Sequence, residues 1–469
     1  MLLESIDKTR LEVSPTLDPK RRSKLGQFMT PGRIASFMAG MFGTLPDRVR
    51  LLDAGAGMGA LTAAFVAEAL ARETPPKAID ATCYEVDDQL ATILDGTLAA
   101  CAKRCAASGV EFTSRVIRDD YILQSAGPLL REQRTYTCAI LNPPYGKINQ
   151  TSEWRLGLRA LGIETVNLYT AFVAVALQQM EDGGEIVAIT PRSFCNGSYY
   201  EPFRRLLLGG SAIANLHVFE SRRSSFKDDD VLQENMIFRV RKAGDQGEVM
   251  LSTDETEARP VAFADIVRPN DSHAFIRLPV SGNALADSVQ ALPCVLADLG
   301  IKVSTGRVVD FRTRDNLRKE PGNDTVPLIY PQHFHAGGIR WPIPDFRKHN
   351  ALADNDDTAK LTTPAGIYVL TKRFTAKEEK RRLVASVYDG GRAGFENHLN
   401  YFHENGEGLP LDLANGLAAF LNSEGVDQYF RIFSGHTQVN ATDLRSLHYP
   451  SRAQLEAVGR GETTIAELF

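Results

Sequence analysis

Apolar and polar positions alternate in blocks along the first half of the chain, and the blocks differ in length. Short apolar runs that end in glycine or acidic residues are typical of buried strands, whereas longer alanine- and leucine-rich runs are typical of helices. Strands that alternate with helices form right-handed βαβ crossovers, so this half predicts a doubly wound, parallel α/β sheet covered on both faces. The predicted strands are 49–59, 78–87, 110–121, 137–145, 183–191, 213–219 and 235–242, and the predicted helices are 60–73, 89–108, 167–180 and 201–208.

The pattern changes after Lys242. Residues 242–260 are polar and rich in turn-forming residues, which predicts a linker or an excursion. The chain from about 261 onward mixes short strands, proline-containing loops and late helices, and this predicts a separate α+β domain. A chain of 469 residues is too long for one ordinary core. We therefore expect an N-terminal segment at 1–45, an α/β domain at 46–245 and a second domain at 260–469.

Composition adds few constraints. The net charge of -5 neither suggests nor excludes nucleic acid, because a local basic face is what matters for DNA. The six cysteines form no CxxC pair, which favours reduced thiols in a cytoplasm and argues against zinc and disulfides. The histidine pairs at 333/335 and 398/403 lack cysteine or acidic partners, so no metal is expected. No apolar run is long enough for a membrane span, and the N-terminus lacks a signal-peptide core.

A glycine-rich loop follows the first predicted strand. The segment "DAGAGMG" places Gly55, Gly57 and Gly59 at alternate positions, where positive φ and close approach of the backbone to a ligand are possible. The spacing is not that of a nucleotide-triphosphate loop. It also departs from G-x-G-x-x-G by ending in Ala60, which that fingerprint tolerates, so a dinucleotide site remains open.

Acidic residues follow the next two predicted strands. Glu85 closes the second, where a carboxylate can accept hydrogen bonds from both ribose hydroxyls. Asp120 closes the third, with Tyr121 beside it to stack on a purine. The glycine loop and these residues together suit an adenosine that carries no phosphate.

The fourth predicted strand ends abruptly in "AILNPPYG". Each proline fixes φ and has no N–H for a ladder, so Pro143 and Pro144 end the strand and leave Asn142 and Tyr145 at its tip.

The order of "GQFMTP", "LLDAGAGMG", "YEVD", "RDDY" and "NPPYG" resembles the S-adenosylmethionine-dependent amino-methyltransferases of DNA, and most of all the gamma-type adenine-N6 enzymes of restriction–modification systems. The resemblance implies a Rossmann-like class I methyltransferase sheet with a C-terminal target-recognition domain. It also implies S-adenosylmethionine as the cofactor and double-stranded DNA as the substrate. It allows a separately encoded restriction endonuclease as a partner, and it predicts a monomer or dimer.

The same resemblance implies the site residues. The Asn142 side-chain oxygen and the Pro143 carbonyl would each accept a hydrogen from the target amine and free its lone pair. Tyr145 and Phe226 would hold a flipped base. Thr30 can cap a helix that begins at Pro31, and its hydroxyl could hold the methionine carboxylate. Asp53 lies where an acid could contact the methionine ammonium or order the glycine loop. The catalytic set is Asn142, Pro143, Pro144, Tyr145 and Phe226, and the cofactor-binding set is Gln27, Phe28, Thr30, Asp53, Gly55, Gly57, Glu85, Asp120, Tyr121 and Asn142.

Other substrates remain compatible with the sequence. Cytosine-N4 methylation is the nearest alternative, although Asn142 favours adenine. RNA bases or protein glutamine are alternatives of a different class, but those enzymes usually lack a C-terminal domain of this size. Cytosine-C5 methylation is set aside because Cys294 lies beyond the predicted catalytic sheet. A fused nuclease is set aside because no ExK follows Pro344–Asp345.

Overall fold

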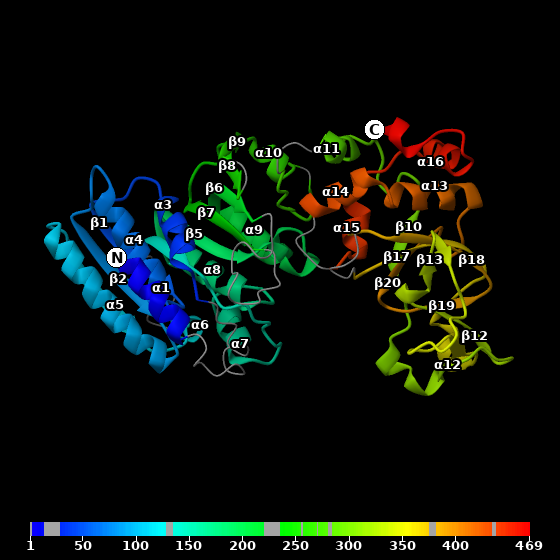
Figure 1. Cartoon of the computed structure of the whole chain (residues 1–469), viewed down its shortest axis with the longest axis horizontal. Coiled ribbons are helices and arrows are strands. Elements are labelled where there is room, and N and C mark those ends of the chain that lie inside the picture. Colours follow the sequence, from blue (N-terminus) through cyan, green and yellow to red (C-terminus); the bar gives the residue numbers. More distant parts are fainter. Residues whose placement is uncertain are drawn as a thin grey trace. The chain divides into compact units, whose positions relative to one another are not determined.

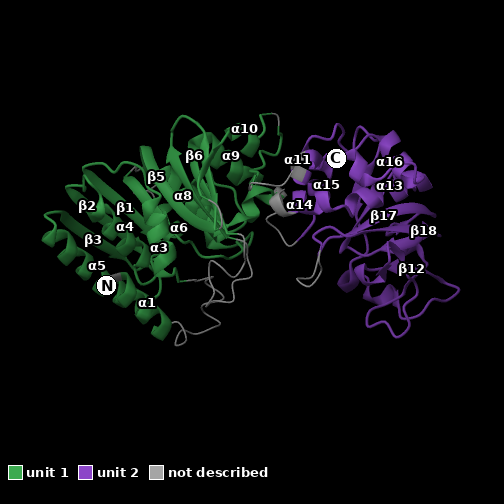
Figure 2. Cartoon of the chain, turned by 45° about the horizontal axis from the view of Figure 1, so that its top comes forward, with its two compact units in different colours: residues 1–280 green, residues 281–469 purple. Residues whose placement is uncertain are grey.

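The computed structural model describes residues 2–13, 29–127, 135–219, 235–254, 257–269, 271–279, 284–374, 381–433 and 438–469. The chain forms two compact units, Met1–Val280 and Ser281–Phe469 (Figure 2). This boundary lies about twenty residues beyond the one expected from the sequence. The reason is that the sheet of the first unit continues past residue 245.

A nine-stranded sheet forms the centre of the first unit, in the order β3-β2-β1-β4-β5-β7-β6-β8-β9. Figure 1 labels β1, β2 and β5 to β9 of this sheet. The first five strands of this order run parallel, and β7 enters antiparallel between β5 and β6. The predicted doubly wound sheet is therefore confirmed. The strands are β1 Arg48–Ala54, β2 Ala78–Tyr84, β3 Glu111–Ile117, β4 Tyr136–Leu141, β5 Met180–Pro191, β6 Ser211–Val218, β7 Asn235–Lys242, β8 Val249–Thr253 and β9 Arg259–Val261.

Helices cover both faces of this sheet. One core cluster joins the sheet to α1, α3, α4 and α5, and another joins it to α6, α7, α8 and α9. The helices are α1 Leu2–Val13, α3 Gly32–Gly40, α4 Ala60–Ala71, α5 Asp88–Ala107, α6 Tyr121–Ser125, α7 Glu153–Ala160, α8 Leu168–Gln179, α9 Glu201–Gly210 and α10 Phe263–Ile266. Within the described residues, no helix combines the length and the apolar character that a membrane crossing requires.

Strand β1 shows why the sequence pattern predicted the sheet. Val49 and Leu51 pack into the cluster of α3 and α4, whereas Leu52 and Ala54 pack into the cluster of α8. Successive side chains of a strand point to opposite faces. A strand buried on both faces therefore reads as one continuous apolar run.

The prediction of a linker or excursion at 242–260 is wrong, because β8 and the start of β9 lie within this range and belong to the sheet. Val249, Leu251 and Thr253 are buried, whereas Met250 and Ser252 are less so, as in a strand with one covered face. β8 pairs in parallel with β6 and so extends the sheet. The alternation covers only five residues between turn-rich segments, which made it easy to miss in the sequence.

The second unit is an α+β structure. Its four-stranded sheet has the order β10-β20-β17-β18, and its five-stranded sheet has the order β11-β15-β12-β19-β16. The strands are β10 Lys302–Thr305, β11 Leu317–Arg318, β12 Thr325–Ile329, β13 Phe334–His335, β14 Gly338–Ile339, β15 Ala351–Ala353, β16 Thr362–Thr363, β17 Gly366–Lys372, β18 Ala385–Gly390, β19 Ala393–Phe395 and β20 Leu399–His403. The helices are α11 Ala284–Gln290, α12 Asp356–Ala359, α13 Leu411–Leu421, α14 Glu424–Phe433, α15 Ala441–Ser446 and α16 Arg452–Gly459.

Candidate active site

A cavity lies at the carboxyl ends of β1, β2, β3 and β4. Its volume is about 1010 Å³, including the part that is open to solvent. The chain leaves β1 toward β2 and β3 on one side, and later returns to place β4 on the other. Ligands of open α/β sheets bind at such a switch point.

The glycine loop after β1 forms one wall of the cavity. Gly55, Gly57 and Gly59 all have positive φ, of 78°, 57° and 83°, as the sequence predicted. A Cβ added to Gly57 would meet no atom within 4 Å, so the space above this residue is open to a ligand. A Cβ added to Gly55 would lie 3.9 Å from the Asn142 carbonyl oxygen. The loop therefore lies close to the segment that follows β4.

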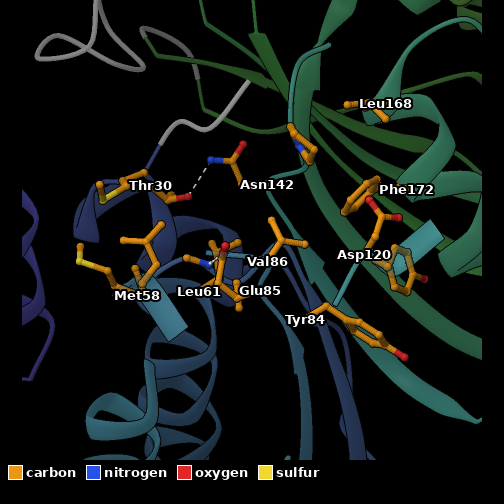
Figure 3. Close-up of a pocket in the computed structure, with 18 of the residues that line it drawn as sticks. Thr30, Met58, Leu61, Tyr84, Glu85, Val86, Asp120, Asn142, Leu168 and Phe172 are labelled. Carbon is orange, nitrogen blue, oxygen red and sulfur yellow. Dashed lines mark hydrogen bonds between the residues drawn. The ribbon is translucent and has the colours of Figure 1, made fainter. Parts of the chain in front are cut away.

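Glu85 holds this loop in place. It directly follows β2 and is 4% exposed. One carboxylate oxygen accepts from the Gly57 N–H and the other from the Asp87 N–H, each at 2.8 Å. Figure 3 shows Glu85 at the cavity. Burial raises the pKa of Glu85, and the two N–H donors oppose that rise by favouring the charged form. Glu85 thus presents a rigid acceptor to the cavity.

Asp120 lies at another part of the cavity wall and caps α6. Its Oδ1 accepts from the Leu123 N–H at 3.0 Å, and its Oδ2 accepts from the Trp154 indole N–H at 2.7 Å. Tyr121 is 2% exposed, and its hydroxyl donates to Gln179 at 2.8 Å. Its ring packs against Tyr84 and Phe172. Both predicted residues line the cavity, with their polar groups already engaged by the protein.

Asn142 stands at the tip of β4 and is 9% exposed. Its Nδ2 donates to the Thr30 hydroxyl at 2.9 Å (Figure 3). This contact orients the carboxamide, because the side-chain oxygen must then face the other way. The Tyr145 hydroxyl donates to that oxygen over a long 3.4 Å. Pro144 lines the cavity with Asn142, and Pro143 lies between them in the chain.

The capping role predicted for Thr30 is wrong. Helix α3 begins at Gly32 with Pro31 as its N-cap residue, and no side-chain cap is made from that position. The Gly32 N–H is bound instead by both carboxylate oxygens of Asp7, each at 3.0 Å. The Thr30 hydroxyl is turned toward Asn142, a partner 112 residues away in the sequence.

Asp53 lies beneath the glycine loop, fully buried near the end of β1. Its Oδ2 accepts from the Thr62 hydroxyl of α4 at 2.6 Å, and its Oδ1 has no hydrogen-bond partner within the described residues. The residues that line the described part of the cavity do not include Asp53. Of its two predicted roles, ordering of the loop is therefore better supported than contact with the cofactor.

Asp53 should make the stability of the protein depend on pH. Burial raises its pKa from 3.8 to about 7, and the nearby charge of Glu85 adds to this effect. Between about pH 4 and 7 the folded protein keeps a proton that the unfolded chain has lost, so the free energy of unfolding falls as the pH rises. We expect wild type to lose about 1–2 kcal/mol more than Asp53→Asn between pH 5 and 7. Urea denaturation at each pH measures the difference, and parallel pH profiles for the two proteins would contradict it.

Three predicted residues lie outside the described residues: Gln27, Phe28 and Phe226. Other residues of the cavity were missed by the sequence analysis. Val86 is 41% exposed directly after Glu85, and Trp154 binds Asp120 from α7. Of these two residues, only Val86 could have been found from the sequence, because it is an apolar residue between two acids in "YEVD". The cavity residues without a prediction include Ile6, Arg10, Met29, Met58, Val86, Trp154, Leu168 and Phe172.

Comparison with known proteins gives consistent results. The profile of the family described as Eco57I restriction-modification methylase matches residues 105–226. The chain is 47% identical to the type II methyltransferase M.PstI of Providencia stuartii, over 97% of this chain and 92% of that protein. It is 46% identical to the type II methyltransferase M.BsuBI of Bacillus subtilis, over 98% and 94%. The solved DrdV–DNA complex shares the fold, with a TM-score of 0.54 and 12% identity over 98% of this chain and 59% of that one.

Proposed function

The chain belongs to the type II DNA methyltransferases of restriction–modification systems, and from this we propose that it methylates the N6 amine of an adenine flipped out of duplex DNA. The observation that carries the choice of an amino group is the oriented carboxamide of Asn142. It stands at the tip of β4, beside the glycine loop, with its nitrogen committed to Thr30. Its oxygen is therefore the end that can accept a hydrogen bond from a substrate amine.

The cavity fits S-adenosylmethionine. Glu85 provides a fixed carboxylate for the ribose hydroxyls, and the open space above Gly57 allows a ligand to approach the backbone. Val86, Tyr84 and Phe172 provide apolar wall beside Asp120, where an adenine ring would lie. When bound, this cofactor supplies an electrophilic methyl group whose bond to sulfur breaks as its bond to the amine nitrogen forms.

The chain itself contributes positioning and fixed dipoles. An exocyclic amine on a purine is a poor nucleophile, because its lone pair is delocalised into the ring. The Asn142 oxygen and the Pro143 carbonyl would each accept one amine hydrogen, which stabilises the positive charge that develops on nitrogen. Neither group is a base, so the proton that the nitrogen loses passes to water. The Tyr145 ring contacts that of Tyr169, whose hydroxyl bonds to Ser193, and this holds Tyr145 beside the amide to stack on the base.

The direct test is to map modified bases in DNA from cells that express the protein. Single-molecule sequencing should find N6-methyladenine in one fixed sequence context, absent from cells that carry the empty vector. N4-methylcytosine in a fixed context would support the alternative substrate. If the protein purified from these cells binds the cofactor but their DNA carries no modified base, the proposed methylation of DNA is contradicted.

We propose that the second unit recognises the target sequence. Arg373 and Phe374 follow β17, with the guanidinium carbon 5.9 Å from the ring centroid, and the Phe374 ring lies 5.0 Å from that of His398. Phe374 is 37% exposed and the His398 side chain 47%. His398 Nδ1 is 2.6 Å from the buried Glu396 carboxylate, which fixes the imidazole. Arg373 is partly exposed, and one of its guanidinium nitrogens donates to the Asn397 carbonyl at 2.7 Å. A partly exposed cation beside exposed aromatic and imidazole groups can contact phosphates and base edges.

Removal of the second unit should separate cofactor binding from target selection. The truncated chain must extend to Pro279, because the Ile276 N–H donates to the Cys195 carbonyl at 2.9 Å and Arg259 donates to the Pro279 carbonyl at 2.5 Å. We expect residues 1–279 to bind S-adenosylmethionine within about fivefold of wild type, and to lose at least about 10³-fold in affinity for target over random DNA. Calorimetry and competition binding measure the two quantities. Retained target preference would refute the assignment of recognition to the second unit.

A partner and a location follow from the family. Type II modification enzymes protect host DNA against a nuclease, so a separately encoded endonuclease that cuts the same sequence is the proposed partner. The proposed location is the bacterial cytoplasm, where the DNA lies. Monomer and dimer are both compatible with the proposal, and analytical ultracentrifugation distinguishes them.

A further inference from the structure

The N-terminal helix α1 is fastened to the segment that carries Thr30. Asp7 of α1 accepts two contacts of 3.0 Å from the Gly32 N–H, at the start of α3. A negative charge is favourable at this end of a helix. A Cβ added to Gly32 would lie 2.7 Å from Asp7 Oδ2, so any larger residue there would have to displace the carboxylate. Position 32 is two residues from Thr30, so Asp7 places this part of α1 close to the Thr30 part of the cavity.

Arg10 extends from the same helix into the cavity wall. Its Nε lies 3.1 Å from Asp7 Oδ1, and its side chain is 7% exposed. Ile6 and Arg10 are four residues apart, hence on one helix face, and both line the cavity with Met29 and Thr30. Asp7 therefore directs the guanidinium toward the Thr30 part of the site.

The charges around the cavity are unevenly placed. Glu85, Asp119 and Asp120 follow β2 and β3, on the side proposed for the ribose and adenine. Arg10 is the one cation among the described residues that line the cavity. A guanidinium carries five N–H donors, so it can serve a protein carboxylate such as Asp7 and a ligand carboxylate together. The Arg10 side of the cavity therefore suits the anionic end of a ligand.

We propose that Arg10 binds the α-carboxylate of the methionine part of S-adenosylmethionine, so that α1 is a cofactor-binding element. The inference rests on the proposed function in taking this cofactor as the ligand. With the ribose at Glu85 and the adenine near Asp120, the amino-acid end extends toward Thr30 and Arg10. A guanidinium is a planar fork of N–H donors that matches the two oxygens of a carboxylate. Decarboxylated S-adenosylmethionine, which lacks only this group, is a matched probe.

The experiment compares the two ligands by calorimetry in the absence of DNA. Wild type should bind S-adenosylmethionine about ten- to hundredfold more tightly than the decarboxylated form. Arg10→Gln should bring this ratio close to one, by weakening only the ligand that has the carboxylate. Arg10→Lys keeps the charge but not the fork, and should give an intermediate ratio. Lys8→Gln is the matched control, because Lys8 is an exposed cation of the same helix, and it should leave the ratio unchanged.

Each alternative outcome has a distinct meaning. The assignment is overturned if Arg10→Gln binds both ligands as tightly as wild type does. It is also overturned if Arg10→Gln weakens binding of both ligands equally, since Arg10 would then act only by holding α1. The wild-type ratio does not depend on how the variant folds, and a wild-type ratio near one overturns the proposal by itself. Wild type that binds neither ligand overturns the proposed function.

Discussion

Replacing Asn142 by alanine is expected to lower the rate of methyl transfer by about 10³-fold or more while the dissociation constant of S-adenosylmethionine stays within about threefold of wild type. The side-chain oxygen of Asn142 is the acceptor that a target amine meets at the tip of β4. Its loss removes stabilisation of charge that develops only in the transition state, so turnover falls and ground-state binding of the cofactor does not. Single-turnover transfer of a labelled methyl group to target DNA, together with calorimetry, measures both quantities.

Thr30 provides a second test of the role assigned to Asn142. Its hydroxyl accepts from Asn142 Nδ2 at 2.9 Å and thereby orients the acceptor oxygen. Thr30→Val should lower single-turnover transfer about tenfold or more by freeing the carboxamide to rotate, and Thr30→Ser should restore it because the hydroxyl returns. An Asn142→Ala protein that methylates adenine at the wild-type rate would refute the role of Asn142 as the acceptor for the target amine. If Thr30→Val weakened only cofactor binding, its hydroxyl would serve the cofactor instead of Asn142.

Glu85→Ala, unlike Asn142→Ala, should mainly weaken binding of the cofactor. We expect it to weaken binding of S-adenosylmethionine about 100-fold, because the ribose would lose a charged acceptor and the glycine loop would lose its support. The loop is affected since the Gly57 N–H donates to Glu85 at 2.8 Å. Asp88→Ala is the control, because Asp88 is an exposed acid three residues away and should leave binding unchanged. Calorimetry gives both constants, and an unchanged constant in Glu85→Ala would count against the ribose assignment.

Local sequence alone points to Asn142 and Glu85. Glycines at alternate positions after an apolar run permit positive φ and predict a ligand loop, and the structure has that loop, with positive φ at Gly55, Gly57 and Gly59. Two adjacent prolines cannot continue a strand, so the residues from Asn142 to Pro144 predict where β4 ends. Acids that follow strands β2 and β3 lie at one edge of a parallel sheet, so residue order predicts that Glu85 and Asp120 lie near each other, and both line the cavity.

The misses have a common origin. The contact between Thr30 and Asn142 joins residues 112 positions apart, and that between Asp120 and Trp154 joins residues 34 apart. Arg10 resembles any cation of a polar N-terminal helix in the sequence, whereas in the structure its face is turned to the cavity. No periodicity or motif records which distant side chains will meet. The helix cap assigned to Thr30 followed a sound local rule, yet Asp7 of another helix binds that helix end.

The sequence by itself determined the α/β class, the positions of most strands of the first unit and the loops that carry the predicted site. Each of these depends on interactions within a few residues, such as side-chain alternation, the restricted φ of proline and the permissive φ of glycine. Only the tertiary structure decided that β8 and β9 extend the sheet, that Asn142 is oriented by Thr30, and that Arg10 lines the cavity. The physical reason is that packing and long-range hydrogen bonds choose partners by proximity in space, which local residue order does not encode.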